Sequence, residues 1–405
     1  MRILYLTSRF PYPPFRGDML HIYNILKPIS RRHEVTLVSF VQRGTRTDWV
    51  DALRPLCHRI ELVYLPTWRS LLQCLRAILS RCPFQVAYFK SRAMSELVHR
   101  VIAEEHPDVI HIHLIRMAQF VESIKDLPRV VDLTDATSLY LERFRAASRN
   151  LLMKLLLSEE LRRILVYERL LAGFELSLVC SRLDLSVMQA HVPEARFEIV
   201  RNSINVSSSP VLEGAIEADP RRIIFTGNMT YFPNGDAARF LVREIFPLIR
   251  RAIPDVRLYI VGQNPPASVR ALAGEGVVVT GFVKDIGAEY ARSAVAVAPV
   301  RFGAGTQYKI LEALALGIPV VTSSTGMGGV DLIPEEDILV ADGPRDFADQ
   351  VVRLLRDPDL RRRMSRSAAD KVLSLHDWEV VAGKVERVYS SVAQARPRQN
   401  TPGAT

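Results

Sequence analysis

Short apolar runs of strand length alternate along the chain with stretches whose apolar residues recur every three or four positions. Residues 2–8 (RILYLTS) and 33–40 (HEVTLVSF) are such runs, and residues 18–32 between them have helical spacing. Further runs follow at RIELVYL (59–65), DVIHIHLI (108–115), RVVDLTD (129–135) and LSLVCS (176–181). Because buried strands alternate with helices, this half of the chain predicts a parallel sheet covered on both faces.

The same alternation starts again in the second half of the chain. It runs through RRIIFTG (221–227), VRLYIVG (256–262), GVVVTGF (276–282), VAVAPV (295–300), IPVVTSS (318–324) and DILVAD (337–342). We therefore predict an α/β protein with two Rossmann-like domains that face each other across a cleft. The expected parts are an N-terminal domain at 1–203, a Ser-, Asn- and Pro-rich linker at 204–220, a C-terminal domain at 221–374, a helix at 375–394 that returns to the N-terminal domain, and a disordered tail at 395–405.

The charge of the chain is unevenly distributed. The net charge is +9, and residues 1–201 carry 29 Lys and Arg against 21 Asp and Glu. A basic N-terminal half suits an anionic partner such as phosphates or an acidic membrane face, but no Lys/Arg-rich run of the nucleic-acid type is present. The sequence also lacks a signal peptide and an apolar stretch long enough to span a bilayer, so we expect a cytoplasmic protein.

A glycine-rich turn that leads into an apolar helix is the first candidate for chemistry. Gly303 and Gly305 precede a helix expected to begin near Gln307, and that helix carries Lys309 and Glu312 in its opening turns. Glycines let the backbone approach a phosphate, and a helix N-terminus offers unpaired N–H groups. Lys309 can add a point charge for a diphosphate, and Glu312 can accept hydrogen bonds from ribose hydroxyls. A solvated Lys and Glu on a surface helix is the alternative.

Polar residues within the strands of the N-terminal half give further candidates. His111 and His113 lie on the same face of one predicted strand, as a metal pair or as satisfied core histidines, with no third ligand nearby. Asp132 and Asp135 end the next strand, where Asp135 can serve the acceptor side, or where Asp135 or Thr134 can cap the next helix. The four cysteines show no metal-binding spacing, so we expect no metal.

An amphipathic basic helix is predicted at 149–173. Its apolar residues share one side, and Lys154, Arg162, Arg163 and Arg169 lie on another. Such a helix can lie on an anionic membrane surface, or it can pack on the sheet with a solvated basic edge, which is the more common arrangement.

Several of these motifs, in this order and spacing, resemble the retaining glycosyltransferases of family 4, which have the two-domain GT-B fold. The resemblance rests on RFPYPPFRGD, DVIHIH, VVDLTDATS, GNMTYFPN, VTGFVKDI and GAGTQYKILEALALGIPVV, and it covers nearly the whole chain. It is closest to the sugar transferase type associated with the PEP-CTERM/EpsH1 exopolysaccharide system. The resemblance implies transfer of a sugar, with retention, from a nucleoside-diphosphate sugar to a glycan or lipid-linked acceptor at the inner face of the cytoplasmic membrane. It implies no cofactor and no essential metal.

The resemblance also implies roles for individual residues. Glu312 matches the second Glu of the family's Glu-x7-Glu motif, whereas Ala304 stands where the first Glu is expected, and His113 matches the active-site histidine. The catalytic candidates are therefore His113 and Glu312. The donor-binding candidates are Arg16, Gly17, Gly227, Asn228, Gly303, Ala304, Gly305, Thr306, Gln307, Lys309 and Glu312, and the acceptor-side candidates are Asp18 and Asp135.

Two departures from the family pattern keep an alternative function open. Ala304 replaces an acid, and the loop TGNMTYFPNGD has asparagines where an Arg and a Lys are usual. The alternative is a non-catalytic subunit of a polysaccharide assembly complex that binds a sugar nucleotide or acts as a scaffold. A dehydrogenase is disfavoured because the third Gly of GxGxxG is missing, and a P-loop NTPase because GxxxxGK[ST] is absent.

Overall fold

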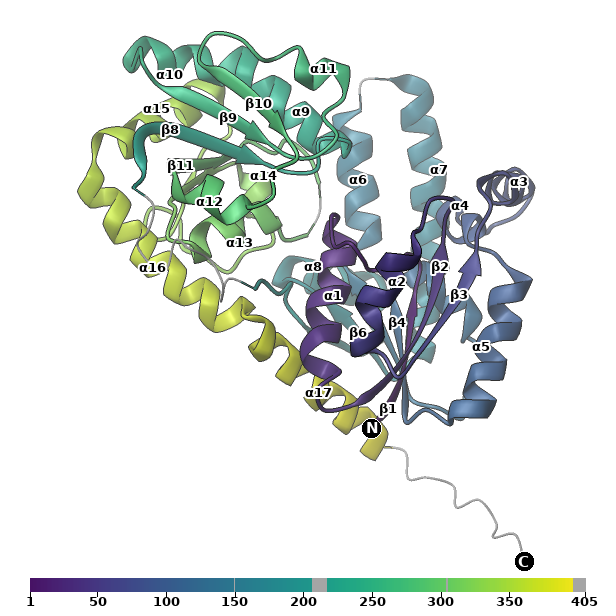
Figure 1. Ribbon diagram of the computed structural model, residues 1–405. Helices are drawn as coiled ribbons and strands as arrows, with labels where there is room; N and C mark the ends of the chain where they lie inside the picture. Colours follow the sequence, from purple (N-terminus) through teal and green to yellow (C-terminus); the bar gives the residue numbers. More distant parts are fainter. Residues whose placement is uncertain (149, 206–216, 304, 396–405) are drawn as a thin grey trace, which may run out of the picture. The chain divides into compact units, whose positions relative to one another are not determined.

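The chain folds into two compact α/β units, each built on a parallel sheet (Figure 1). The computed structural model describes residues 1–148, 150–205, 217–303 and 305–395. Unit 1 comprises Met1–Glu142, Asn150–Arg201 and the residues from Trp378 on, and unit 2 comprises Arg143–Arg149 and Asn202–Asp377. Most of the expected linker and nearly all of the expected tail lie outside the described residues.

Unit 1 contains a seven-stranded parallel sheet with the order β3-β2-β1-β4-β5-β6-β7. Its strands are β1 (Arg2–Thr7), β2 (Glu34–Val41), β3 (Arg59–Tyr64), β4 (Val109–His113), β5 (Arg129–Thr134), β6 (Leu176–Val179) and β7 (Phe197–Ile199). Its helices are α1 (Gly17–Ile29), α2 (Thr47–Leu53), η1 (Arg54–Leu56), α3 (Thr67–Ala77), α4 (Phe84–Tyr88), α5 (Arg92–Glu105), η2 (Ile115–Phe120), α7 (Leu151–Tyr167), η3 (Glu168–Gly173), α8 (Arg182–His191) and α17 (Trp378–Gln394). Helix α6 (Thr137–Ala147) begins in unit 1, and its last residues are grouped with unit 2.

Unit 2 contains a six-stranded parallel sheet with the order β10-β9-β8-β11-β12-β13. Its strands are β8 (Asp219–Thr226), β9 (Arg257–Val261), β10 (Val277–Gly281), β11 (Ser293–Ala298), β12 (Val320–Thr322) and β13 (Leu339–Val340). Its helices are α9 (Phe232–Phe240), the π-helical turn η4 (Leu241–Ile245), α10 (Phe246–Ala252), α11 (Ala267–Arg270), α12 (Ile286–Ala291), α13 (Tyr308–Ala315), α14 (Ser324–Met327), α15 (Pro344–Arg356) and α16 (Pro358–His376).

The central strands are apolar throughout because helices cover both faces of each sheet. In β8, Ile223 and Phe225 belong to one hydrophobic core and Ile224 to another, as the alternation of strand side chains requires. In unit 1, Val385 of the last helix, α17, belongs to the same core as Ile25 of α1 and Val35 of β2. Helix α17 therefore packs within the unit that contains the first strand.

The strand order reverses once in each sheet, and the reversal marks where a ligand site is expected. Strand β1 lies between β2 and β4, and β8 lies between β9 and β11, so connections leave these pairs in opposite directions. Crevices at the carboxyl ends of such strand pairs are the usual binding positions in doubly wound sheets. The loops after β1, β4, β8 and β11 carry most of the candidate site residues named above.

The predicted fold class, two Rossmann-like α/β units, is confirmed, and every apolar run named in the sequence forms a strand. Strand β7 was not predicted, because a strand of three residues is too short to show a period. Within the described part of the chain, no helix has the length and apolar character needed to cross a bilayer.

Candidate functional site

The donor-side candidates of unit 2 lie at the carboxyl ends of the neighbouring strands β8 and β11. Gly303 and Gly305 have φ angles of 146° and 73°, in the region that favours glycine. Gln307 is the N-cap residue of α13, so the helix begins where the sequence predicted. Ala304 lies outside the described residues. A glycine turn thus leads directly into a helix N-terminus beside the end of β11.

Lys309 is half-buried on the first turn of α13, and its ammonium group contacts neutral oxygens. Its Nζ donates to Asn234 Oδ1 and to Gln307 Oε1, each at 3.0 Å. Burial lowers the pKa of Lys309 to about 8, although the charge of Glu312 opposes this shift. Among the described residues, no carboxylate lies within ion-pair distance of this ammonium group. The two hydrogen bonds fix the position of the ammonium group. Because both acceptors are neutral, the positive charge of Lys309 can still interact with an anion.

Glu312 is half-buried one turn further along α13. Burial raises the pKa of Glu312 to about 7, and the nearby Lys309 only partly offsets this. A carboxyl group of this kind titrates near neutral pH, so a ligand that hydrogen-bonds to the ionised form shifts its protonation. The pair Lys309 and Glu312 gives this edge of unit 2 one cation and one acid that both titrate near neutral pH.

The loop after β8 is folded by its own asparagines. Asn228 Oδ1 accepts from the N–H and the hydroxyl of Thr230, at 3.0 and 2.6 Å. Asn234 Nδ2 donates to Asn228 O at 2.9 Å, while its Oδ1 accepts from Lys309. A Cβ at Gly227 would lie 2.7 Å from Asn234 Nδ2, so a glycine is needed for this close packing. Asn234 therefore positions Lys309, and Asn228 stabilises the conformation of the loop.

Three contacts that support this edge were missed by the sequence analysis. Tyr290 is fully buried, and its Oη lies 2.6 Å from Thr226 Oγ1 and donates to Lys309 O at 3.1 Å. Thr306 donates to Gly329 O at 2.8 Å, and a Cβ at Gly329 would lie 2.7 Å from Gly305 C. The strand end, the glycine turn and the helix start are therefore held together by groups distant in sequence.

Arg301 was also missed, although it lies in the same connection as the glycine turn. Its Nε and Nη2 donate to the two carboxylate oxygens of Asp236, at 2.8 and 2.6 Å, and its guanidinium group lies 4.8 Å from the Phe240 ring centroid. This bidentate pair ties the connection after β11 to α9. The sequence offered one usable signal, a cation two residues before the first glycine of the turn.

The glycine loop candidates of unit 1 lie at the start of α1, after β1. Arg16 is the N-cap residue of α1, and Gly17 is its exposed first residue. Asp18 accepts from Arg9 Nη1 at 2.6 Å, and its other oxygen lies 3.4 Å from Arg16 Nε. Although burial opposes the shift, the Arg9 and Arg16 charges lower the pKa of Asp18 to about 2. Asp18 is therefore an ionised anchor that holds both arginines at this strand end.

The two histidines of β4 share one face of the sheet and enter different contacts. His111 Nδ1 lies 2.8 Å from Tyr389 Oη of α17, and its Nε2 lies 3.5 Å from Asp132 Oδ2. His21 of α1 binds the same carboxylate oxygen at 2.7 Å. Both contacts hold Asp132 ionised, so its pKa stays well below the usual range despite burial. His111 is thus part of a buried polar network between the sheet, α1 and α17.

His113 ends β4 and is buried, with its Nε2 3.4 Å from Thr134 Oγ1. Burial lowers the pKa of His113 to about 3, so its imidazole is neutral at physiological pH. Its Nδ1 has no hydrogen-bond partner within the part of the chain that the structure describes. The next residue, Leu114, has a φ of 71°, an unusual conformation for a branched side chain. This strand end combines a neutral histidine with a constrained backbone.

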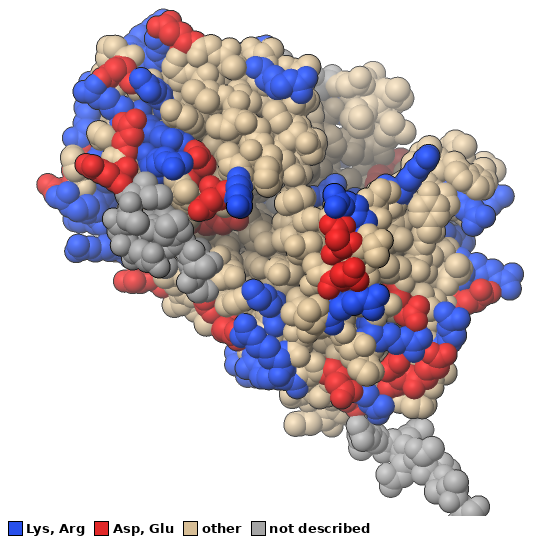
Figure 2. Space-filling view, viewed as in Figure 1, with Lys and Arg blue, Asp and Glu red and all other residues tan. Residues whose placement is uncertain are grey.

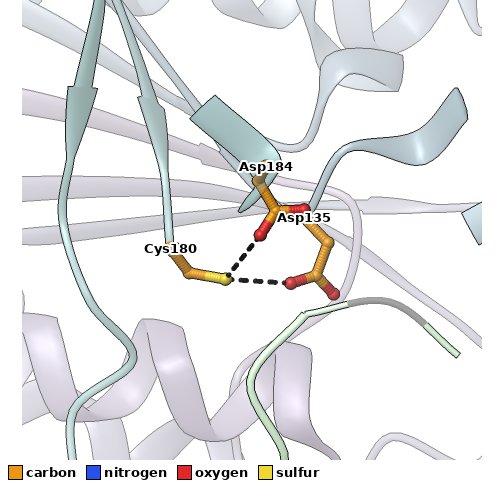
Figure 3. Close-up of side chains that lie close together, drawn as sticks. All are labelled: Asp135, Cys180 and Asp184. Carbon is orange, nitrogen blue, oxygen red and sulfur yellow. Dashed lines mark hydrogen bonds between the residues drawn. The ribbon is translucent and has the colours of Figure 1, made fainter. Parts of the chain in front are cut away.

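Asp135 lies close to Cys180 and Asp184 (Figure 3). Burial, and then the charge of Asp184, raises the pKa of Asp135 to about 7. Cys180 Sγ is 3.1 Å from Asp135 Oδ1, whereas Asp184 accepts from the Ala136 N–H at 2.9 Å and from the Ser181 hydroxyl. Because these hydrogen bonds already engage the cluster, we assign no metal to it.

Capping of α6 by Asp135 or Thr134 was the alternative prediction for the end of β5. The amides at the start of α6 are bound by distant acids, since Ala136 N–H donates to Asp184 and Ser138 N–H donates to Glu168 Oε1 at 3.2 Å. In the part of the chain that the structure describes, the side chains that bind these amides come from α8 and η3. The carboxyl group of Asp135 accepts a hydrogen bond from the Cys180 thiol.

Part of the chain matches a known protein family. Residues 220–357 match the family described as Glycosyl transferases group 1. A phosphatidyl-myo-inositol mannosyltransferase of Mycobacterium leprae (strain TN) is 30% identical over 237 residues. That alignment covers 56% of this chain and 61% of the mannosyltransferase, so the chain spans less than two thirds of this relative.

Solved structures match over almost the full length of the chain. Sucrose-phosphate synthase from Thermosynechococcus elongatus has a TM-score of 0.75 at 17% identity, covering 98% of this chain and all of that one. Anabaena Alr3699/HepE in complex with UDP has a TM-score of 0.68 at 15% identity, covering 96% of this chain and 100% of that one. At these identities the likeness shows the fold alone. The family match therefore lies within unit 2, and the solved structures share the two-unit fold.

Proposed function

We propose that the protein is a glycosyltransferase that moves a sugar from a nucleoside-diphosphate sugar to a hydroxyl group of an acceptor. The observation that carries this proposal is the charge arrangement at Lys309. Its half-buried ammonium group is held by the neutral oxygens of Asn234 and Gln307, beside a glycine turn and a helix N-terminus. Such a site binds an anion, and a diphosphate fits the combination of backbone amides and one point charge.

The group that leaves in such a reaction is a nucleoside diphosphate, and negative charge grows on it as the glycosidic bond breaks. Groups placed in advance around that charge stabilise the transition state more than the ground state. We assign this task to Lys309, the amides of the turn around Gly305 and the N-terminus of α13. Glu312 then accepts hydrogen bonds from the ribose hydroxyls, and its ionised form is the one that binds.

The candidates of unit 1 are assigned to the sugar and the acceptor. His113 is neutral and retains a nitrogen without a described partner, so it can exchange a hydrogen bond with a sugar hydroxyl. Asp18 and Asp135 are the acceptor-side groups, and Asp135 is the one that titrates near neutral pH. Retention of configuration and a glycan or lipid-linked acceptor, as in exopolysaccharide assembly, complete the proposal. The relative named for a phosphatidylinositol acceptor supports the lipid-linked choice.

Nucleotide titration of the whole protein tests the donor site. UDP, GDP, dTDP and ADP are titrated by calorimetry into the wild type and into Lys309→Ala, with the exposed Lys90→Ala as the matched control. We expect one nucleotide to bind, and Lys309→Ala to weaken that binding about tenfold or more, as loss of a charged hydrogen-bonding partner does. The control should bind as the wild type does. Equal affinity of Lys309→Ala and wild type would remove Lys309 from the site.

One observation favours a second candidate function, a non-catalytic subunit that binds a sugar nucleotide. Ala304 stands where the resembling family carries an acid that contacts the donor sugar. Release of nucleoside diphosphate from a nucleotide sugar, measured with lipid and glycan extracts as acceptors, separates the two. Turnover above background supports the transferase, and tight nucleotide binding without turnover supports the subunit.

A further inference from the structure

Helix α3 has an apolar stripe that faces solvent. Its large apolar residues and those that follow it recur every three or four positions, on one side of the helix: Trp68, Leu71, Leu72, Leu75, Ile78 and Leu79. All of them are exposed, from 39% for Leu72 to 93% for Leu79, whereas Ser70 and Ala77 on the opposite side are buried. An amphipathic helix in a globular protein normally places its apolar stripe on the core. Here the orientation is reversed.

The first turns of α7 expose a second set of apolar residues. Leu151, Leu152, Met153, Leu155 and Leu156 are all exposed, and Leu157 is the first buried residue of the helix. With the stripe of α3, these positions account for 11 of the 21 exposed large hydrophobic residues in the described part of the chain. Such concentration on two helices marks an interaction surface, because scattered single residues are the ordinary case.

The two sets belong to one surface because α3 and α7 are joined. Arg163 of α7 donates from Nη1 to Ala77 O at 2.6 Å and to Cys82 O at 3.0 Å, at the end of α3. Leu156 lies seven residues before Arg163, on the same side of α7 and about 10 Å along the helix. In Figure 2 the surface over the amino-terminal end of α7 is almost entirely tan, with few charged side chains. We call residues 67–82 and 150–158 the α3–α7 surface.

The charges of the α3–α7 surface all have one sign. It contains Arg69, Arg76, Arg81 and Lys154 and no Asp or Glu. The next acids along α7, Glu159 and Glu160, are engaged, the first by Arg162 and Arg163 and the second by the Phe84 and Gln85 amides. The Arg69 guanidinium group also lies 5.2 Å from the Trp68 ring centroid, over an exposed aromatic. Cations therefore flank an apolar stripe that no acid interrupts.

We propose that the α3–α7 surface inserts into the interface of an anionic phospholipid membrane. Leucines and a tryptophan enter the acyl boundary, while the flanking arginines and Lys154 meet lipid phosphates, as interfacial amphipathic helices do. A second copy of the chain is a poorer occupant, because face-to-face association would bring four cations against four cations. The proposal is independent of the donor site, although a membrane position would suit the lipid-linked acceptor of the proposed function.

Vesicle flotation of the whole protein tests this proposal. Binding is measured to vesicles of phosphatidylglycerol with phosphatidylcholine and to vesicles of phosphatidylcholine alone. The variants are Leu71→Ser/Leu75→Ser in α3, Leu152→Ser/Leu155→Ser in α7 and Arg69→Glu/Arg76→Glu. The matched control, Val278→Ser/Ile333→Ser, changes two exposed apolar residues of unit 2. All these side chains are exposed, so the fold should tolerate each change.

We expect the wild type to float with the anionic vesicles, and each leucine variant to weaken that binding about tenfold or more. The arginine variant should lose the preference for anionic over neutral vesicles, and the control should float as the wild type does. Equal flotation of wild type and leucine variants would overturn the proposal. So would a dimer, seen by light scattering, that the leucine changes dissociate while no vesicles bind. Nucleotide titration of the same variants should give unchanged affinity, so failure here is distinct from failure of the donor site.

Discussion

Lys309 shows how a single residue can combine burial with a free positive charge. Its amine binds two amide oxygens, and Tyr290 holds the backbone carbonyl of the same residue. Asn234 in turn is fixed through Asn228, so neutral side chains determine where the cation lies. The proposed function assigns to Lys309 the positive charge that the loop after β8 lacks. Nucleotide binding at the proposed donor site would therefore depend on the protonation of Lys309 and Glu312.

Affinity for a nucleotide sugar should therefore pass through a maximum between about pH 7 and pH 8. Lys309 must be protonated, so affinity falls as the pH rises through its pKa of about 8. Glu312 must be ionised, so affinity falls as the pH drops through its pKa of about 7. Beyond each value the loss approaches about tenfold per pH unit, as expected for one linked proton. Calorimetric titration across pH 5.5–9.5 measures this profile.

A matched variant separates the two limbs of that profile. Glu312→Gln should remove the acidic limb and leave the alkaline one, because its amide does not titrate. An acidic limb that persists unchanged in Glu312→Gln would contradict the role given to this carboxylate.

At the scale of elements, α17 shows how a terminal helix completes a core begun by the first strand. Its buried face contributes Val381, Ala382, Val385, Val388 and Tyr389 to the core of unit 1. Tyr389 also reaches His111 of β4, so the helix adds a polar contact to the network around Asp132. The helix α3 shows the opposite arrangement, with its apolar stripe outside. Both helices therefore have apolar residues at helical spacing, but those of α17 lie in the core and those of α3 face solvent.

Shortening a buried valine of α17 should destabilise unit 1. Val385→Ala removes two methyl groups from a fully buried position, which costs about 2 kcal/mol of unfolding free energy. Val380→Ala on the exposed side of the same helix is the control, with an expected change within about 0.5 kcal/mol. Trp49, Trp68 and Trp378 are the three tryptophans and all belong to unit 1, so fluorescence during urea unfolding follows this unit. Equal midpoints for Val385→Ala and wild type would show that α17 adds nothing to this core.

At the scale of the whole molecule, the two units contain sheets of similar topology, and the proposed function assigns a different part of the reaction to each unit. Most candidate residues lie at or after the strands at which the order reverses, β1 and β4 in unit 1 and β8 and β11 in unit 2, whereas Asp135 follows β5. The donor assignment concerns unit 2, which contains the family match. The surface assigned to a membrane belongs to unit 1.

Hydrogen exchange measured by mass spectrometry can test this division across the chain. A nucleotide that binds should slow exchange about tenfold or more in residues 227–234 and 305–312, since binding suppresses local opening. Residues 67–82 and 150–158 should exchange at the same rate with and without it. Anionic vesicles should produce the reverse pattern. Nucleotide protection confined to the α3–α7 surface would contradict both assignments.

Much of the candidate site could be predicted because its signals are local. Gly303, Gly305, Lys309 and Glu312 occur within ten consecutive residues, so the turn and the helix start are visible as a motif. The contact of Lys309 with Asn234 and Tyr290 could not be predicted in the same way. It joins segments that lie far apart in sequence, and their meeting depends on which strands become neighbours.

The sequence by itself determined where strands and helices form, because the periods of two and 3.6 residues are properties of short segments. It also determined that the charged residues of the α3–α7 surface are all basic, and that two glycines precede Lys309 and Glu312. Only the tertiary structure decided which side of α3 faces solvent, which acids cap α6 and which oxygens hold Lys309. A helical period shows which residues share a side of the helix, but it does not show whether that side faces the core or solvent. Each of these outcomes depends on the packing of segments that are distant in sequence, which local patterns do not encode.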